Sequence, residues 1–316
     1  MNLNKEEIIF ITDRDKYIIE GIEKEGYKCY RPYREKSLVD RVSRELWFRS
    51  PVNDVYWFNK EILNSNPKYI FVHDPKITVS FLEWLQDNFC NTTIFFMYCN
   101  LVGNARHITP EDIPEGISVW TYDEVDSKRY GINKYISGGY FGSYIGKRQD
   151  TEYDVFFVGK DKGRGEKLLE LENKLNNEGL RTKFIITKDG RLAKRKKYYS
   201  TTIDYKEVVE YDNKSKAILN IVMPGQEGAT MRDYEALYNG VKLITTNVHA
   251  TNFDFYNEQN IFILGRDNFD KIVDFVNSPY VDIDQNIKDK HLFDNQVVEI
   301  ITACGDICDD SNSNIG

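Results

Sequence analysis

Short apolar runs alternate with amphipathic segments along the first half of the chain. The runs are rich in β-branched and aromatic residues and predict strands, while apolar residues three or four apart between them predict helices. The predicted strands cover residues 7–12, 27–33, 68–73, 92–98 and 117–122, and the predicted helices cover residues 15–25, 38–48, 77–89 and 123–130. This alternation predicts a parallel, doubly wound sheet, in which ligands bind at the carboxyl ends of the strands.

The same alternation resumes after residues 135–146, a segment with four glycines and three tyrosines that we interpret as a connector between domains. The strands predicted beyond it cover residues 153–158, 182–186, 217–223, 242–245 and 260–264, and the helices cover residues 166–178, 206–212, 231–239, 269–277 and 287–302. We therefore predict an α/β protein with two Rossmann-like, doubly wound domains.

The domain boundaries follow from the connector and from the composition of the C-terminus. The N-terminal domain is expected at residues 1–147 and the C-terminal domain at residues 148–284. A C-terminal helix at 285–304 could pack back on the N-terminal domain. The acidic, Ser/Asn-rich tail at 305–316 is expected to be disordered.

Composition narrows the classes of function. The chain has 316 residues, of which 41% are hydrophobic, and this is enough for two domains with their own cores. A net charge of −8 argues against nucleic acid as the main partner. No run of about 18 apolar residues and no signal peptide is present, so we expect a soluble, cytoplasmic protein. The basic run at 191–197 is either a solvated loop or a peripheral contact with anionic lipid at the inner face of the membrane.

The stretch at residues 225–247 carries most of the predicted chemistry. It follows an apolar strand and contains a loop, a helix and the next strand. The helix is opened by three small residues, namely Gly228, Ala229 and Thr230, with Thr230 as the N-cap. A helix that begins in this way offers free backbone N–H groups, and the positive end of its dipole, to an anion such as phosphate.

Three charged side chains lie around this helix start. Arg232 adds a guanidinium fork that suits phosphate, and Glu235 lies where a carboxylate can bind a pair of sugar hydroxyls. Glu227 precedes the helix, on the loop that faces the same crevice. Two acids beside a phosphate-binding turn suit a nucleotide diphosphate sugar. The alternative is an ordinary strand–loop–helix–strand unit whose acids are solvated.

A second loop, at residues 159–165, has the sequence Gly-Lys-Asp-Lys-Gly-Arg-Gly. A glycine-rich basic loop between a strand and a helix can close on a phosphate. It is not a P-loop, because the Gly-Lys-Ser/Thr ending is missing. A solvated turn is the alternative interpretation.

Candidate acid–base residues in the first half lie at strand ends. His73 and Asp74 are adjacent, and a histidine beside a carboxylate can act as a base or hold a hydroxyl. The alternative is that Asp74 caps the turn before Pro75 and that His73 packs in the core. Asp13 follows the first strand in an Asp-x-Asp pattern with Asp15, which helix capping explains better than metal binding.

Glu227 and Glu235 are separated by seven residues. Glu235 lies in the run Thr-Met-Arg-x-x-Glu-Ala-Leu, which is followed by Gly-x-Lys-Leu-Ile-Thr-Thr-Asn. The whole stretch resembles the Glu-x7-Glu donor segment of GT-B glycosyltransferases, and most of all the bacterial enzymes that build capsule or lipopolysaccharide. The resemblance implies that Glu235 binds the nucleotide ribose, that Glu227 contacts the donor sugar, and that residues 228–230 receive the diphosphate. The aromatic residue that commonly follows Gly228 in the family is absent here.

The resemblance also implies that the two Rossmann-like domains face a cleft, and it implies roles for the rest of the second half. The loop that begins at Gly159 would supply basic residues to the diphosphate. The candidates are Lys160 and Arg164, with Lys162 and Lys167 as alternates. Tyr205 would line the pocket of the nucleobase.

The function implied by the resemblance is transfer of a sugar from a nucleotide-sugar donor to a hydroxyl of a bacterial surface glycan or its lipid-linked precursor. We expect no metal or other cofactor, because Lys160, Arg164, Arg232 and the helix start would stabilise the departing diphosphate. Glu-x7-Glu favours retention. If the reaction inverts, a base is needed, and Asp13, His73 and Asp74 are the candidates. The alternatives are a catalytically silent GT-B-like protein that binds a glycan or a partner, and a sugar-nucleotide epimerase of the same fold.

Overall fold

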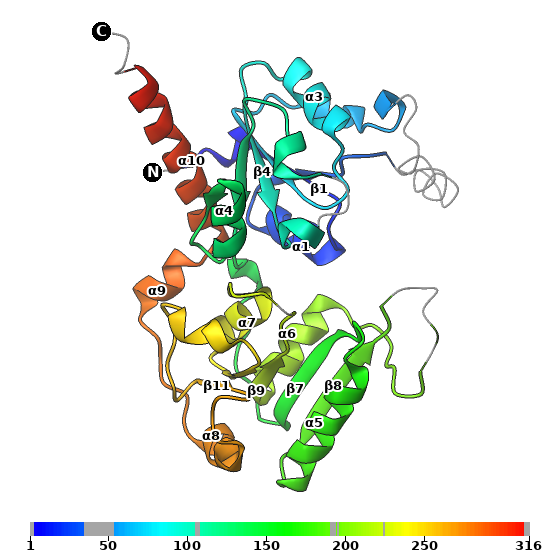
Figure 1. Ribbon diagram of the computed structural model, residues 1–316, viewed down its shortest axis with the longest axis vertical. Helices are drawn as coiled ribbons and strands as arrows, with labels where there is room; N and C mark the ends of the chain where they lie inside the picture. Colours follow the sequence, from blue (N-terminus) through cyan, green and yellow to red (C-terminus); the bar gives the residue numbers. More distant parts are fainter. Residues whose placement is uncertain are drawn as a thin grey trace. The chain divides into compact units, whose positions relative to one another are not determined.

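The protein divides into two compact units. The structure is a computed structural model that describes residues 3–34, 54–104, 108–189, 194, 196–223 and 225–312. The first unit comprises Met1–Ile136 and Gln296–Gly316, and the second comprises Ser137–Asn295. Each unit contains one parallel sheet with helices around it (Figure 1), which confirms the prediction of two Rossmann-like α/β domains. The helix predicted at 38–48 lies outside the described residues.

The sheet of the first unit has the strand order β2-β1-β3-β4-β5-β6. Its strands are β1 (Ile8–Thr12), β2 (Lys28–Tyr30), β3 (Tyr69–His73), β4 (Thr93–Tyr98), β5 (Ser118–Thr121) and β6 (Asn133–Lys134), and its helices are α1 (Lys16–Lys24), α3 (Val79–Asn88) and α4 (Glu124–Tyr130). β1 and β3 pair in register, with Thr12 opposite His73. The residues that follow these two strands are therefore brought to the same edge of the sheet.

Both faces of this first sheet are buried, because consecutive residues in the middle of β1, β3 and β4 are apolar and therefore point to both faces. On one face, Ile9 and Val72 pack with Phe81 and Leu85 of α3. On the other face the rings of Phe10, Phe71 and Phe95 form a row, with centroid separations of 4.9 Å and 4.7 Å. These contacts hold the carboxyl ends of β1, β3 and β4 in fixed positions.

The sheet of the second unit has the order β11-β10-β9-β7-β8. Its strands are β7 (Tyr153–Lys160), β8 (Thr182–Thr187), β9 (Ser215–Asn220), β10 (Lys242–Thr245) and β11 (Ile261–Ile263), and its helices are α5 (Gly165–Asn177), α6 (Tyr205–Asn213), α7 (Met231–Asn239), α8 (Ile272–Asn277), α9 (Gln285–Lys290) and the start of α10 (Phe293–Asn312). The chain passes from β7 to β8 on one side, and then to β9 on the other side. The carboxyl ends of β7 and β9 thus flank the switch point of the sheet, where open α/β sheets bind ligands.

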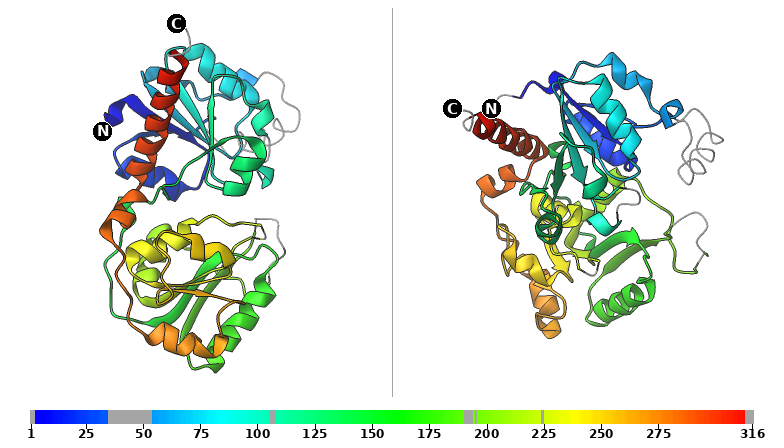
Figure 2. Two further views of the ribbon diagram at one scale, coloured as in Figure 1. Left: turned by 60° about the vertical axis from the view of Figure 1, so that its left-hand side comes forward. Right: turned by 45° about the horizontal axis from the view of Figure 1, so that its top comes forward.

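The helices of the second unit cover the two faces of its sheet (Figure 2). Val155 and Phe157 of β7 belong to the cluster that includes Leu168 of α5 and Ile272 of α8. The alternate residues of the strands, such as Phe156, are also fully buried. On that face Phe156 stacks on Tyr211 of α6, with 5.2 Å between the ring centroids.

The segment interpreted as a connector is bonded into the second unit. The backbone N–H of Tyr140 donates to the carbonyl of His291 at 2.9 Å, and the N–H of Phe293 donates back to Tyr140 at 2.8 Å. The ring of Tyr140 stacks on Tyr238 with 4.6 Å between centroids. The boundary between the units consequently falls between Ile136 and Ser137 and not after residue 147.

The C-terminal helix differs from its predicted form. Two helices, α9 and α10, replace the single one, and they are interrupted at His291, whose side chain is held by Asp254 at 2.8 Å and accepts a hydrogen bond from the N–H of Gly138 at 3.0 Å. From Gln296 onward α10 belongs to the first unit, where Glu299 accepts from the N–H of Ile136 at 2.6 Å. α10 extends to Asn312, into the segment expected to be disordered.

Replacement of Gly138 by alanine should destabilise the second unit. A Cβ at this position would lie 2.2 Å from the buried ring of Tyr234, so the ring or the backbone has to move. We expect a loss of about 1–3 kcal/mol in the free energy of unfolding, the usual range for overpacking, measured by chemical denaturation. Gly103→Ala is the matched control, because nothing lies within 4 Å of its added Cβ. Equal denaturation midpoints for Gly138→Ala and Gly103→Ala would contradict the close packing of Gly138 against Tyr234.

Candidate functional site

Arg164 joins the two strand ends at the switch point of the second unit. It precedes α5, and its Nη1 donates a hydrogen bond to the carbonyl of Ile221, just after β9. Its Nε is buried and has no hydrogen-bond partner among the described residues. The guanidinium lies beside Gly159, where an added Cβ would be 3.5 Å from Nη2 of Arg164, an ordinary contact distance, and a closer 3.1 Å from the ring of Phe157. The arginine therefore retains donor capacity at the place where a ligand is expected.

Two lysines add to the positive charge of Arg164. Lys160 ends β7 and is exposed, and Lys162 follows in a left-handed conformation with φ of 46°. The Lys162 N–H donates to the Asp189 carboxylate at 2.6 Å, which fixes the turn. Desolvation, and then the charges of Arg164 and Lys160, lower the pKa of Lys162. Three cations that repel one another are a favourable environment for an anion.

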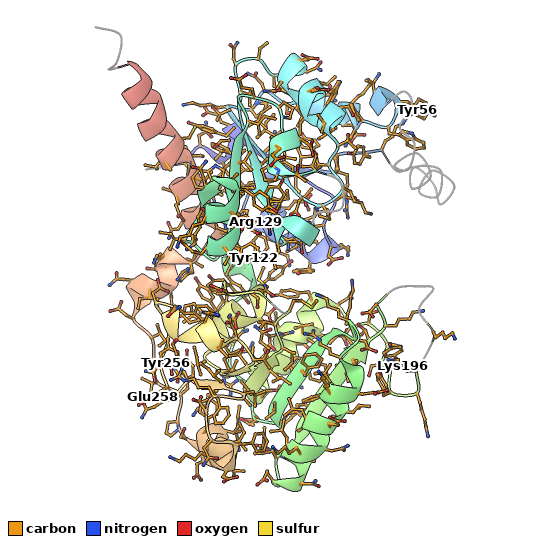
Figure 3. The ribbon with its side chains drawn as sticks, in the orientation of Figure 1. Tyr56, Tyr122, Arg129, Lys196, Tyr256 and Glu258 are labelled. Carbon is orange, nitrogen blue, oxygen red and sulfur yellow. The ribbon has the colours of Figure 1, made fainter. Side chains whose placement is uncertain are left out.

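Asp161, in the middle of this basic loop, is only 1% exposed and was not among the predicted residues. It accepts hydrogen bonds from four donors, which are Gly165 N–H at 2.6 Å, Tyr199 at 2.5 Å, Tyr198 at 2.9 Å and Lys196 at 3.0 Å. Burial alone would raise the pKa of Asp161, but these hydrogen bonds hold it well below its usual range. Figure 3 shows Lys196 on the segment that follows β8. Three of the four donors come from this segment and the fourth is the N–H of Gly165, so among the described contacts the Asp161 carboxylate forms no hydrogen bond or salt bridge with the Arg164 side chain.

Gly165 is required for this arrangement. A Cβ on Gly165 would lie 2.3 Å from the hydroxyl oxygen of Tyr198, so only glycine lets the tyrosine reach Asp161. The first amide of α5 is thus occupied by a carboxylate of the protein. The signal in the sequence was a lone acid among basic residues, four positions before the glycine that opens the helix.

The loop between β9 and α7 is capped as predicted. Thr230 and Asp233 form a capping box, in which the Thr230 N–H donates to the Asp233 carboxylate at 2.6 Å. The side chain of Asn220, the last residue of β9, donates to both residues, at 3.0 Å and 2.8 Å. The N–H groups of residues 228, 229, 231 and 232 make no hydrogen bond to any described residue. This start of α7 therefore still has free donors, unlike the start of α5.

Arg232 and Glu235 were expected to contact the donor. In the structure they are bound to each other, and Arg232 also binds Asp212. Arg232 lies 3.0 Å from Asp212 of α6 and 2.7 Å from Glu235, and its side chain is 15% exposed. Tyr205 donates to the other oxygen of Glu235 at 2.8 Å. Burial raises the pKa of the Asp212 and Glu235 carboxyl groups, although the charge of Arg232 opposes the shift. The physical reason for this inward placement is Asp212, a fully buried acid that the sequence analysis did not single out.

Glu227 lies on the exposed part of the same loop. Its carboxylate is 3.5 Å from Nε2 of His249, and both side chains are 41% exposed. His249 belongs to a 3₁₀ helix, η7 (Val248–Asn252), directly after β10. The loops after β9 and β10 therefore bring a carboxylate and an imidazole together near the start of α7.

The candidates of the first unit gather at the ends of β1, β3 and β4. Asp13 is paired with Arg31 at 3.1 Å and with Lys76 at 3.2 Å. Asp74 is buried and accepts from the N–H of Cys99 at 2.5 Å and from the Asn100 amide at 3.3 Å. Asp74 thus binds the end of β4, in addition to preceding Pro75.

The pKa values of His73 and Asp74 shift in opposite directions in similar surroundings, because burial favours the neutral form of both a base and an acid. Burial, followed by the charge of Arg14, lowers the pKa of His73 to about 3, so the ring is neutral. Its Nδ1 is buried without a hydrogen-bond partner in the described part of the chain. Burial raises the pKa of Asp74, although the Cys99 N–H and Arg14 oppose the shift. The two side chains could accept hydrogen bonds from a hydroxyl at this edge.

The described residues contain neither a metal site nor a membrane span. Within the described ranges, no three His, Cys, Asp or Glu side chains gather closely enough to hold a metal ion. Among the helices of the described residues, none has both the length and the apolar character needed to cross a bilayer.

Comparisons with known proteins show similarity of fold. No protein-family model and no curated protein sequence matches the chain. Sucrose-phosphate synthase from Thermosynechococcus elongatus is similar in structure, with a TM-score of 0.63 at 11% identity, over 95% of this chain and 98% of that one. A DNA-modifying β-glucosyltransferase has a TM-score of 0.49 at 13% identity over 94% of both chains, and a lipopolysaccharide outer core galactosyltransferase has 0.47 at 13% over 95% of this chain and 99% of that one. The likeness to the synthase supports the predicted GT-B fold.

Substitution of Asp161 by asparagine should destabilise the second unit in a pH-dependent way. Because the pKa of Asp161 is lowered in the folded state, its stabilising effect is present above the unfolded pKa of about 3.9 and is lost as the pH falls towards the folded value. We expect the free energy of unfolding to be lower by about 1.5–3 kcal/mol at pH 7, and this difference from the unaltered protein to become smaller below about pH 4. Denaturation at several pH values measures it.

The exposed Asp282 provides the control, as Asp282→Asn. A difference between Asp161→Asn and the unaltered protein that does not change with pH would contradict the charged state assigned to Asp161.

Proposed function

We propose that the protein is a glycosyltransferase that uses a nucleotide diphosphate sugar as donor. The observation that carries the proposal is Arg164, which spans the ends of β7 and β9 with an unused donor while the nearby acid Asp161 is satisfied by other residues. The free N–H groups at the start of α7 follow the same strand end. The similarity of fold to sucrose-phosphate synthase, an enzyme named for a glycoside product, supports this class of reaction.

In this proposal the second unit stabilises the departing nucleoside diphosphate. Lys160, Lys162 and Arg164 face the negative charge that develops on the leaving group, and the N–H groups at the start of α7 donate to its oxygens. The task is assigned to the chain's own groups and not to a metal ion. The nucleoside would lie beside the ring of Tyr205, whose hydroxyl is held by the buried carboxylate of Glu235.

The acceptor in this proposal is a hydroxyl of a bacterial surface glycan or its lipid-linked precursor, as the sequence resemblance implies. The Glu-x7-Glu spacing favours a retaining reaction. For an inverting reaction, Asp74 is the best base of the three candidates, because its raised pKa moves towards neutrality. Asp13 is occupied by Arg31 and Lys76, and His73 is too weakly basic.

One observation favours a second candidate function, a catalytically silent protein of the same fold that binds a glycan or a partner. Glu235 is engaged by Arg232 and Tyr205, and so is not open to a ribose in this conformation. The transferase releases nucleotide from its donor, whereas a silent protein releases none. Assay of nucleotide release with a panel of sugar nucleotides separates the two.

Thermal-shift measurements with UDP, GDP, ADP, CDP and dTDP test the anion site. We expect stabilisation by one of them, of about 2.7 kcal/mol at 100-fold excess over its dissociation constant. Arg164→Gln should weaken this binding roughly 10- to 100-fold, because hydrogen bonds to a charged group are lost.

Arg129→Gln, at an exposed arginine of α4 (Figure 3), is the matched control. No shift with any nucleotide, or equal affinities for the Arg164 and Arg129 variants, would contradict the proposed site.

A further inference from the structure

A single buried amide holds two loops of the second unit together. Asn247 is 1% exposed and directly follows Thr245 and Thr246 at the end of β10. Its Nδ2 donates to the backbone carbonyl of Glu227 at 3.0 Å, and its Oδ1 accepts from the backbone N–H of His249 at 2.9 Å. The loop after β9 and the start of η7 are therefore fixed relative to each other by one side chain.

Thr246 fixes the beginning of the same loop. Its N–H donates to the carbonyl of Asn220 at 3.1 Å, and its hydroxyl oxygen accepts from the N–H of Val222 at 3.1 Å. With the capping box at Thr230, the loop after β9 is held at its start, near its middle and at its end. The positions of Glu227 and His249 thus follow from buried polar contacts and not from the surface.

The two side chains held in this way are open to a ligand. Nε2 of His249 lies 3.5 Å from Oε1 of Glu227, and no other polar partner of either side chain occurs among the described residues. A contact between two side chains that are each 41% exposed contributes little stability, so stability alone does not explain the buried hydrogen bonds of Asn247 that hold the two loops together.

The chemistry of the pair matches a hydroxylated group and not a phosphate. A carboxylate only accepts hydrogen bonds and repels phosphate, whereas an imidazole can donate from one nitrogen and accept at the other. Side by side, they complement two neighbouring hydroxyls, each of which both donates and accepts. Glu227 lies on the loop that leads into α7, directly before the N–H groups assigned to the diphosphate, and His249 of η7 lies beside it.

We propose that His249 is a specificity-determining residue that binds, together with Glu227, two hydroxyls of the transferred sugar, and that Asn247 is the positioning residue of this pair. The proposal rests on the proposed function. It goes beyond the predicted contact of Glu227 with the sugar, because it adds the imidazole and the amide that set the geometry.

The test compares each nucleoside diphosphate with its sugar nucleotides by calorimetric titration of the full chain. The probes are UDP, GDP, ADP and dTDP, followed by UDP-glucose, UDP-galactose, UDP-N-acetylglucosamine, GDP-mannose, ADP-glucose and dTDP-glucose. His249→Ala should weaken the best sugar nucleotide about tenfold and leave the matching diphosphate unchanged, because only the sugar contact is lost.

Asn247→Asp tests the positioning role. The substitution keeps the acceptor for the His249 N–H and removes the donor to the Glu227 carbonyl. We expect the same selective loss for the sugar nucleotide, with the diphosphate affinity retained. Glu258→Ala, at an exposed residue after η7 (Figure 3), is the control and should change neither affinity.

The outcomes separate this inference from the proposed function. If the unaltered protein binds no diphosphate, both fail. If it binds a diphosphate but His249→Ala keeps the ratio of the two affinities, the inference alone is overturned. Equal weakening of both ligands also overturns it, because His249 would then support the loop and not the sugar.

Discussion

The pairing of the buried carboxylate Asp161 determines which cations of the second unit are available to a ligand. A desolvated carboxylate requires donors, and the nearest charges in the sequence are Lys160, Lys162 and Arg164. The fold supplies Lys196, Tyr198 and Tyr199 instead, from the segment after β8. Arg164 is thereby left to reach the end of β9, and the positive loop keeps its charge at the switch point. At α7 the buried carboxylates are paired with an arginine instead. Asp212 and Glu235 bind Arg232, so this arginine is mostly buried and is not available to a ligand.

Much of the fold could be predicted from the sequence, because its signals are local. Continuous apolar strands, amphipathic helices and the capping box of Thr230 and Asp233 depend on residues a few positions apart. The pairing of Arg232 with Asp212, twenty positions earlier, depends on how α6 packs beside α7 and leaves no local pattern. The same holds for Asp161, whose side-chain donors lie beyond β8, and for the connector, which is bonded to residues near His291.

The residues of the candidate site were named from the sequence, and the structure shows which of them are engaged by other side chains. Arg164 and the start of α7 lie where ligands bind to such sheets, and Glu227 is exposed nearby. Glu235 and Arg232 form a buried support behind them. In the first unit, pairing of Asp13 with two cations and the neutral state of His73 leave Asp74 as the carboxyl group best suited to accept a proton. Only tertiary contacts distinguish these three residues.

The central claim is that the second unit binds the diphosphate of a nucleotide between the β7–α5 loop and the start of α7. A crystal structure of the protein with its preferred nucleoside diphosphate tests this most directly. The account predicts that Arg164 donates to a phosphate oxygen, and that N–H groups among residues 228–232 donate to the same diphosphate. A diphosphate bound elsewhere, with Arg164 still occupied only by Ile221, would contradict it.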